Sequence, residues 1–142
     1  MRVMIDTCVI MDAVQGRKPF DQDAEQVFLA ASNMLFDGYI TAKAMTDIFY
    51  LSHRLTHDNA KARTILSRLA AIFEVADTAG ADVMAAIASN TADFEDAVMI
   101  ETAVREKMDC IVTRNTHDYQ YSPIRVLLPG DFIRELTGQP SV

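Results

Sequence analysis

The chain has 142 residues, half of them hydrophobic, and a formal net charge of −7 at neutral pH. A chain of this length can bury most of its apolar surface in one core without disulfides or structural metals. The negative charge excludes a protein that coats nucleic acid by bulk charge attraction, but it does not exclude nucleic-acid chemistry at a local site. We expect one domain over residues 1–138 and a short tail over 139–142.

The cysteines and the hydropathy pattern narrow the class further. Cys8 and Cys110 are the only cysteines. They lie too far apart in the sequence for a disulfide framework or a zinc site, so we expect free thiols in a reducing compartment. No basic flank followed by a long apolar core indicates a secretion signal, and no apolar run approaches the length of a membrane span. The sequence therefore predicts a cytoplasmic protein without a membrane segment.

The first part of the chain alternates strand and helix patterns. Residues 3–5 are apolar and predict a short buried strand, and the apolar spacing over 10–14 predicts a helix that turns back over the sheet. A longer helix is expected over 21–36. Asp37 and Gly38 are expected to close it, because glycine is common just past a helix end. The β-prone residues 39–41 then predict a second strand.

The middle of the chain predicts two helices and a basic segment. One helix begins at Ala42 and is broken over 53–56, and Asp58 caps a second helix that runs to Phe73. The segment 53–68 holds the single acid Asp58 against four cations, which are Arg54, Lys61, Arg63 and Arg68. This segment is either a solvated helix face or an edge that contacts phosphates or a partner.

The remaining elements continue the alternation. Strand signals cover 74–76, 110–113 and 125–128, and helix signals cover 78–88, 93–107 and 129–136. In the helix over 93–107 we expect Ala97, Ile100 and Val104 to face inward. Strands that alternate with helices throughout the chain predict an α/β fold of three layers, in which helices cover both faces of a central parallel sheet.

Acidic side chains stand at positions that such a sheet brings together. Loops at the carboxyl ends of parallel strands form the ligand sites of open α/β sheets. Asp6 follows the first strand, Asp118 follows the fourth, Asp96 opens a helix and Asp47 lies one turn into the helix after the second strand. Clustered carboxylates repel one another unless a cation neutralises them, and an all-oxygen set suits Mg²⁺ or Mn²⁺. Such metals activate water and stabilise phosphodiester displacement, so the sequence predicts a nuclease.

Several of these polar residues also have a purely structural interpretation. Asp93 fits the N-cap of its helix, with Asp96 in the reciprocal capping position. Asn115 and Asp118 are ordinary turn residues as well as candidate ligands. Asp12 is expected to be a solvated helix residue. The three histidines are scattered among polar neighbours, and we interpret none of them as a metal ligand or catalytic base.

Three motifs together resemble those of the PIN domain family, which includes VapC-like toxin ribonucleases and PilT N-terminus-like domains. The motifs are Ile5-Asp6-Thr7-Cys8-Val9-Ile10-Met11-Asp12, Asp93-Phe94-Glu95-Asp96-Ala97 and Ile111-Val112-Thr113-Arg114-Asn115-Thr116-His117-Asp118-Tyr119. The resemblance covers nearly the whole chain, from Met4 to about Leu136. It implies a parallel sheet between helices and a ribonuclease that depends on Mg²⁺ or Mn²⁺.

The resemblance also implies roles for individual residues. Asp6, Asp96 and Asp118 would hold the metal. Asp47, where the family usually has Glu, would complete the catalytic acids. Supporting roles would fall to polar neighbours of these acids, which are Thr7, Asp93, Thr113 and Asn115. Asn115 stands where many members have a further Asp.

The partners that the resemblance implies are RNA, an inhibitor and a second copy of the chain. VapC-like toxins are often homodimers, and a cognate antitoxin holds them inactive by covering or entering the acidic pocket, which suits an inhibitor's Arg or Lys. RNA would be the substrate. The candidate contacts to its backbone are Arg17, Lys18, Arg54, Lys61 and Arg114.

The leading hypothesis is a metal-dependent endoribonuclease that acts as the toxin of a type II toxin–antitoxin pair. The alternative is a PIN-like RNA- or protein-binding module with a degraded active site, because Asp47 and Asn115 depart from the family's acids. A haloacid-dehalogenase-like phosphatase would need an aspartate two residues after Asp6, where Cys8 stands. The sequence therefore favours the nuclease.

Overall fold

A computed structural model of the protein describes residues 1–139, and within them five strands alternate with seven α-helices and one 3-10 helix. The strands are β1 (Arg2–Ile5), β2 (Asp37–Thr41), β3 (Glu74–Ala76), β4 (Cys110–Val112) and β5 (Arg125–Leu127). The helices are α1 (Thr7–Gln15), α2 (Asp21–Ser32), α3 (Ala42–Thr56), α4 (Asn59–Ile72), α5 (Gly80–Ala88), α6 (Phe94–Arg105), η1 (Thr116–Tyr119) and α7 (Pro129–Thr137). The last three residues of the expected tail, 140–142, lie outside the described residues.

The five strands form one parallel sheet in the order β3-β2-β1-β4-β5. The central strand β1 pairs with β2 on one side and with β4 on the other. The strand order therefore reverses between β1 and β4, and open α/β sheets bind their ligands in the crevice beyond the carboxyl ends of the strands at such a reversal. Asp6 follows β1 at this point, and its backbone N–H donates to the carbonyl of Val112 at 3.0 Å.

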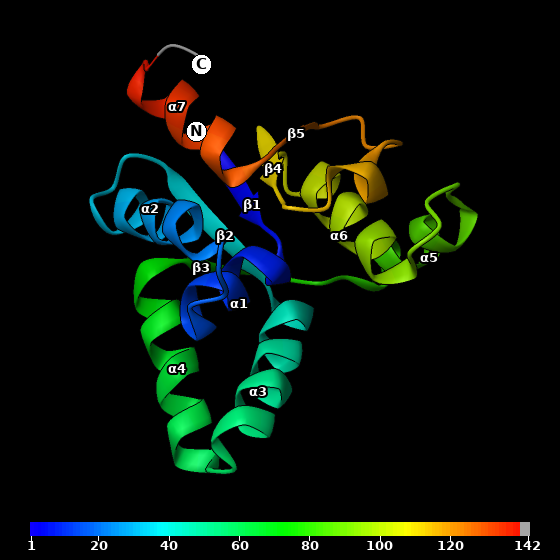
Figure 1. Ribbon diagram of the computed structural model, residues 1–142. Helices are drawn as coiled ribbons and strands as arrows, with labels where there is room; N and C mark the ends of the chain where they lie inside the picture. Colours follow the sequence, from blue (N-terminus) through cyan, green and yellow to red (C-terminus); the bar gives the residue numbers. More distant parts are fainter. Residues whose placement is uncertain (140–142) are drawn as a thin grey trace.

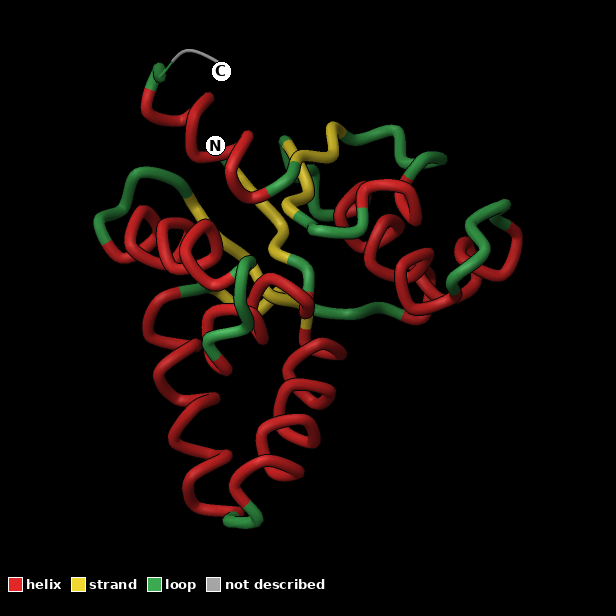
Figure 2. Tube along the Cα trace, viewed as in Figure 1, coloured by secondary structure: helices red, strands yellow, loops and turns green. Residues whose placement is uncertain are grey.

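Helices cover both faces of the sheet, as the sequence predicts (Figure 1). Along β1, Val3 and Ile5 join the core beneath α1, α2, α3, α4 and α7, whereas Met4 joins the opposite core beneath α6 and η1. Neighbouring residues of a strand point to opposite faces, so one short apolar strand supplies both cores. Figure 2 shows the sheet enclosed between the two sets of helices. None of the helices within residues 1–139 meets the length and hydropathy that a membrane span requires.

The expected helix over 21–36 is too long. Helix α2 ends at Ser32, and Asp37 and Gly38 belong to β2 rather than to a helix end. Gly38 pairs with Val3 of the central strand. A Cβ atom at Gly38 would lie 2.6 Å from Cδ1 of Phe73. Glycine is present here because an aromatic ring packs directly on the strand, which the sequence pattern does not reveal.

Two further expectations about helices are wrong. Helix α3 continues through 53–56 to Thr56 and ends where His57 adopts a left-handed conformation, with φ +50°. No glycine or proline interrupts the residues 53–56, and packing against α4 keeps them helical. Val104 of α6 is 40% exposed, because the buried face of that helix passes through Ala103 instead.

Asp12 is buried, contrary to the expectation of a solvated helix residue. Its side chain is 1% exposed and accepts two hydrogen bonds from Arg114, at 2.8 and 3.2 Å. The guanidinium group of Arg114 also lies over the ring of Phe20, 4.1 Å from its centroid. This bidentate pair joins α1 to the loop after β4. Its two residues are 102 positions apart, so local patterns could not reveal the pairing.

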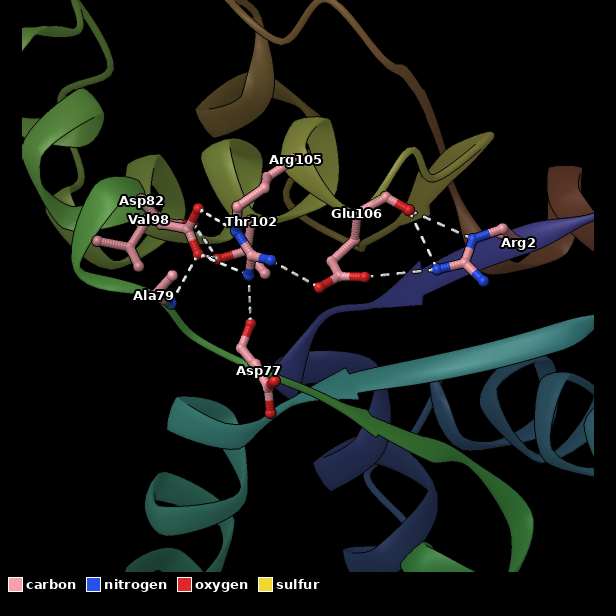
Figure 3. Close-up of polar contacts among 8 residues, drawn as sticks. All are labelled: Arg2, Asp77, Ala79, Asp82, Val98, Thr102, Arg105 and Glu106. Atoms are coloured by element: carbon pink, nitrogen blue, oxygen red, sulfur yellow. Dashed lines mark hydrogen bonds and ion pairs between the residues drawn. The ribbon is translucent and has the colours of Figure 1, made fainter.

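A second buried carboxylate fastens α5 to α6 (Figure 3). Asp82 is 2% exposed and accepts hydrogen bonds from the hydroxyl of Thr102 at 2.9 Å and from Nε of Arg105 at 2.8 Å. Arg105 also donates to the backbone carbonyl of Asp77 at 2.7 Å. Removing either partner would leave a charge without its counter-ion, which destabilises the fold. The network therefore holds α6, the helix that carries Asp96, in a fixed position.

Replacing Gly38 with Ala is expected to destabilise the fold by about 1–3 kcal/mol, because the new methyl group would overlap the rings of Phe73 and Phe36. The matched control is Gly80→Ala at the start of α5, where a Cβ atom meets nothing within 4 Å. That change is expected to be neutral or to stabilise by up to about 1 kcal/mol. Urea unfolding followed by circular dichroism measures both. Equal stabilities for the two variants would contradict this account of Gly38.

Candidate active site

The cavity that contains the predicted acids lies at the carboxyl ends of β1 and β2, between α3 and α6. Its volume is about 320 Å³. The charged side chains that line it are Asp6, Lys43, Asp47, Glu95 and Asp96. The fold therefore brings three of the four predicted catalytic acids, Asp6, Asp47 and Asp96, to one cavity. Thr7 lines the same cavity.

Asp6 is the innermost of these acids and is 6% exposed. It occupies the N-cap position of α1, but its side chain makes no capping hydrogen bond. Instead its Oδ2 accepts a hydrogen bond from the hydroxyl of Thr113 at 2.7 Å and a weaker one from the thiol of Cys8 at 3.5 Å. Burial and the charge of Asp6 raise the pKa of Cys8 to about 11, which keeps this thiol protonated as a donor. The protein therefore orients the carboxylate of Asp6 without neutralising it.

Asp96 is partly buried in the first turn of α6. Its Oδ1 accepts a hydrogen bond from the hydroxyl of Tyr119 at 3.0 Å. Burial, followed by the negative charge of Asp6, raises the pKa of Asp96 from 3.8 to about 7, although the bond from Tyr119 acts in the opposite direction. Within residues 1–139 neither Asp6 nor Asp96 makes an ion pair with Lys, Arg or His, so no cation of these residues offsets their charges directly. The pair Asp6 and Asp96 therefore favours a bound cation.

The other predicted residues lie at the edge of this pair. The side chain of Asp93 caps α6 by accepting a hydrogen bond from the backbone N–H of Asp96 at 3.1 Å. Asp118 is exposed on η1, and its charge adds to the rise in the pKa of Asp96. The backbone N–H of Asn115 donates to the hydroxyl of Thr113 at 3.0 Å. Asp93 and Asn115 thus act here by positioning backbone and neighbouring groups.

Asp47 differs from the inner acids because it is paired. Nζ of Lys43 lies 2.6 Å from Oδ2 of Asp47 and 3.0 Å from Oε1 of Glu95. Burial disfavours the charged form of Lys43, but the hydrogen bonds to these two carboxylates outweigh it and raise the pKa of Lys43. The ammonium group therefore stays charged and links α3 to α6 across the cavity.

Sequence reasoning missed three residues of this site, namely Lys43, Glu95 and Tyr119. Lys43 and Asp47 are four residues apart on one helix, and this spacing is typical of an ion pair, so the sequence could have predicted it. Glu95 and Tyr119 both stand within recognised motifs. Their contacts to Lys43 and Asp96 cross between elements, so no local pattern indicated them.

The residues predicted to contact RNA differ in exposure and in whether another side chain already holds them. Arg114 is held by Asp12, and Arg17 donates to Gln15 at 2.6 Å. Arg54 and Lys61 are exposed near the turn between α3 and α4. Lys18 is also exposed, so Lys18, Arg54 and Lys61 are the more accessible to a phosphate backbone.

The donor atoms fit a hard divalent cation, although they do not form a complete cage. Within residues 1–139, no three side chains of His, Cys, Asp or Glu are grouped closely enough to hold a metal ion. Mg²⁺ usually keeps several waters and is bound through one or two carboxylates together with substrate phosphates. The oriented, unneutralised carboxylates of Asp6 and Asp96 match that requirement.

Several solved structures share this fold. A toxin–antitoxin complex from Klebsiella pneumoniae is 20% identical, with a TM-score of 0.66, and the match covers 89% of this chain and 97% of that one. For VapBC2 from Rickettsia felis, bound to a DNA fragment from its promoter, the identity is 15%, the TM-score 0.67 and the coverage 90% and 98%. FitAcB from Neisseria gonorrhoeae is 19% identical with a TM-score of 0.62. The match covers 89% of this chain and 97% of that one.

A comparison with curated proteins found no significant match. The sequence model of the PIN domain matches residues 2–117, which is most of the chain and includes β1, α6 and β4. The strands and helices, the acidic cavity and the resemblance of the motifs agree with this match. The chain belongs to the PIN domain family.

Proposed function

We propose that this protein is a metal-dependent endoribonuclease and the toxin of a type II toxin–antitoxin pair. The observation that carries the proposal is the pair of carboxylates Asp6 and Asp96, which has no ion-pair partner within residues 1–139 and lines a cavity at the carboxyl ends of β1 and β2. Membership of the PIN domain family supports nuclease chemistry at this site. A pair of acids that the fold brings together without a cation of its own is suited to binding one from solution.

In this proposal Asp6 and Asp96 hold Mg²⁺ or Mn²⁺, with Asp118 as a third ligand at the rim. The ion would polarise the scissile phosphate and activate a water molecule. Thr113 holds Oδ2 of Asp6, and Tyr119 holds Oδ1 of Asp96, so each carboxylate keeps a fixed orientation. Such fixed ligands need little reorganisation when the substrate arrives.

The proposed substrate is RNA, which the protein would cleave in the cytoplasm. Arg54 and Lys61 are exposed and would contact the phosphate backbone. The proposed partners are a second copy of the chain and a cognate antitoxin, because the solved structures that share the fold include toxin–antitoxin complexes. An Arg or Lys of the inhibitor would complement the acidic cavity.

The alternative, a binding module with a degraded site, differs in one measurable respect. Replacing Asp6 with Asn is expected to lower cleavage of a mixed RNA substrate by about 100-fold or more, since even the residues that support metal ligands are worth about 10–100-fold. Cleavage by the unmodified protein should require Mg²⁺ or Mn²⁺ and stop with EDTA. Glu135→Gln, which removes an exposed ion pair between Arg125 of β5 and α7, is the control and should cleave normally. Metal-independent cleavage, or none at all, would refute the proposal.

Asp96→Asn is expected to change the pH dependence of stability. The pKa of Asp96 rises from 3.8 to about 7 on folding, so the folded protein binds more protons than the unfolded chain between these values. The stability that this proton confers is complete at low pH and is lost as the pH rises through about 7. The variant has no such loss. In EDTA its Tm should exceed that of the unmodified protein by roughly 3–8 °C more at pH 8 than at pH 5.

Differential scanning fluorimetry at the two pH values measures this difference. At pH 8, Mg²⁺ should raise the Tm of the unmodified protein and leave that of the Asp96→Asn variant nearly unchanged, because a ligand that binds only the folded state stabilises it. A Tm difference between the two proteins that is the same at both pH values would show that folding does not raise the pKa of Asp96.

A further inference from the structure

We propose that the ammonium group of Lys43 takes the place of a second divalent cation, so that the active-site cavity binds one divalent ion per chain. This inference rests on the proposed nuclease function and deepens it. It assigns Lys43 a direct part in the reaction and gives Asp47 the role of holding that lysine.

The four acids of the cavity fall into two pairs. Asp6 and Asp96 form the inner pair, and within residues 1–139 neither makes an ion pair with Lys, Arg or His. Asp47 and Glu95 form the outer pair, and Nζ of Lys43 lies within 3.0 Å of both. One pair therefore remains open to a cation from solution, whereas the other already contains a cation of the protein.

Three contacts fix the position of Lys43, one through its backbone and two through its side chain. Its backbone N–H, in the first turn of α3, donates to the hydroxyl of Thr78 at 3.3 Å. Its side chain reaches Asp47 one turn further along the same helix and Glu95 on α6. The ammonium group thus connects α3 to α6 at the cavity, although Lys43 and Glu95 are 52 residues apart in the sequence. These contacts place the half-exposed side chain of Lys43 at the wall of the cavity.

A second divalent ion at the outer pair would have to displace this ammonium group or lie beside it. Like charges repel more strongly as they approach, and a divalent ion is repelled twice as strongly as a singly charged one. In two-metal nucleases the ions lie about 3.5–4 Å apart and stabilise the attacking and leaving oxygens together. Here the second positive charge of such an arrangement comes from Lys43.

The hydrogen-bonding capacity of Lys43 allows it to contact the substrate. An ammonium group has three N–H donors and no acceptor. Asp47 and Glu95 take two of the three donors. The third remains for a non-bridging oxygen of the scissile phosphate when RNA occupies the cavity.

The test is the stoichiometry of Mn²⁺ binding, measured by isothermal titration calorimetry on the full chain without RNA. The unmodified protein is expected to bind one ion. Lys43→Met frees Asp47 and Glu95 and should add a second, weaker site, so that two ions bind. In the double variant Lys43→Met with Asp47→Asn, the second site should disappear again. At Mn²⁺ concentrations that fill only the first site, cleavage by Lys43→Met should be slower than cleavage by the unmodified protein.

The matched control is Lys107→Met, which removes the same charge from an exposed residue beyond the other end of α6. It should bind one ion. Two ions on the unmodified protein, or a single ion on Lys43→Met, would overturn the inference and leave the proposed nuclease intact. No Mn²⁺ binding by the unmodified protein would instead refute the proposed function. If Lys43→Met does not fold, the stoichiometry of the unmodified protein and of Lys43→Gln decides the question.

Discussion

The pairing of β1 with strands on both of its sides is the constraint on which this protein depends. It buries the apolar residues Val3, Met4 and Ile5 in the middle of the sheet and fixes the position of Asp6 at the carboxyl end of this strand. Because β4 is the neighbour on one side, the hydroxyl of Thr113 reaches the carboxylate of Asp6 across 107 positions of sequence. The same arrangement places η1, with Tyr119, against α6 and Asp96. The geometry of the site thus follows from the order of the strands.

The acids of this protein serve two purposes, and their partners distinguish them. Asp12 and Asp82 are the most deeply buried carboxylates, and an arginine satisfies each of them. These pairs join elements that are distant in sequence. Asp6 and Asp96 are oriented by a hydroxyl each and have no ion-pair partner within residues 1–139. Burying charge without a counter-ion opposes folding, and such groups are concentrated where a protein binds a ligand or performs chemistry.

Lys43 shares features of the structural ion pairs and of the open acidic site. It pairs with Asp47 and Glu95 as an arginine would in a structural pair, but it does so at the wall of the cavity that contains Asp6 and Asp96. Its compact ammonium group concentrates one positive charge at a point, whereas a guanidinium spreads its charge over a planar fork. Asp47 is an acid whose partner is provided by the preceding turn of the same helix.

The sequence by itself determined the alternation of strands and helices, the parallel three-layer fold, the N-cap role of Asp93 and the family of the chain. These features rest on apolar periodicity, capping residues and short motifs, which act over a few neighbouring residues. The tertiary structure alone decided that Gly38 lies in a strand, that Asp12 is buried, that Val104 is exposed and that Lys43 bridges two acids. Each of these depends on a side chain from a distant element, such as Phe73, Arg114 or Glu95. Burial and charge pairing are properties of such long-range contacts, whereas a sequence pattern records the preferences of the local chain.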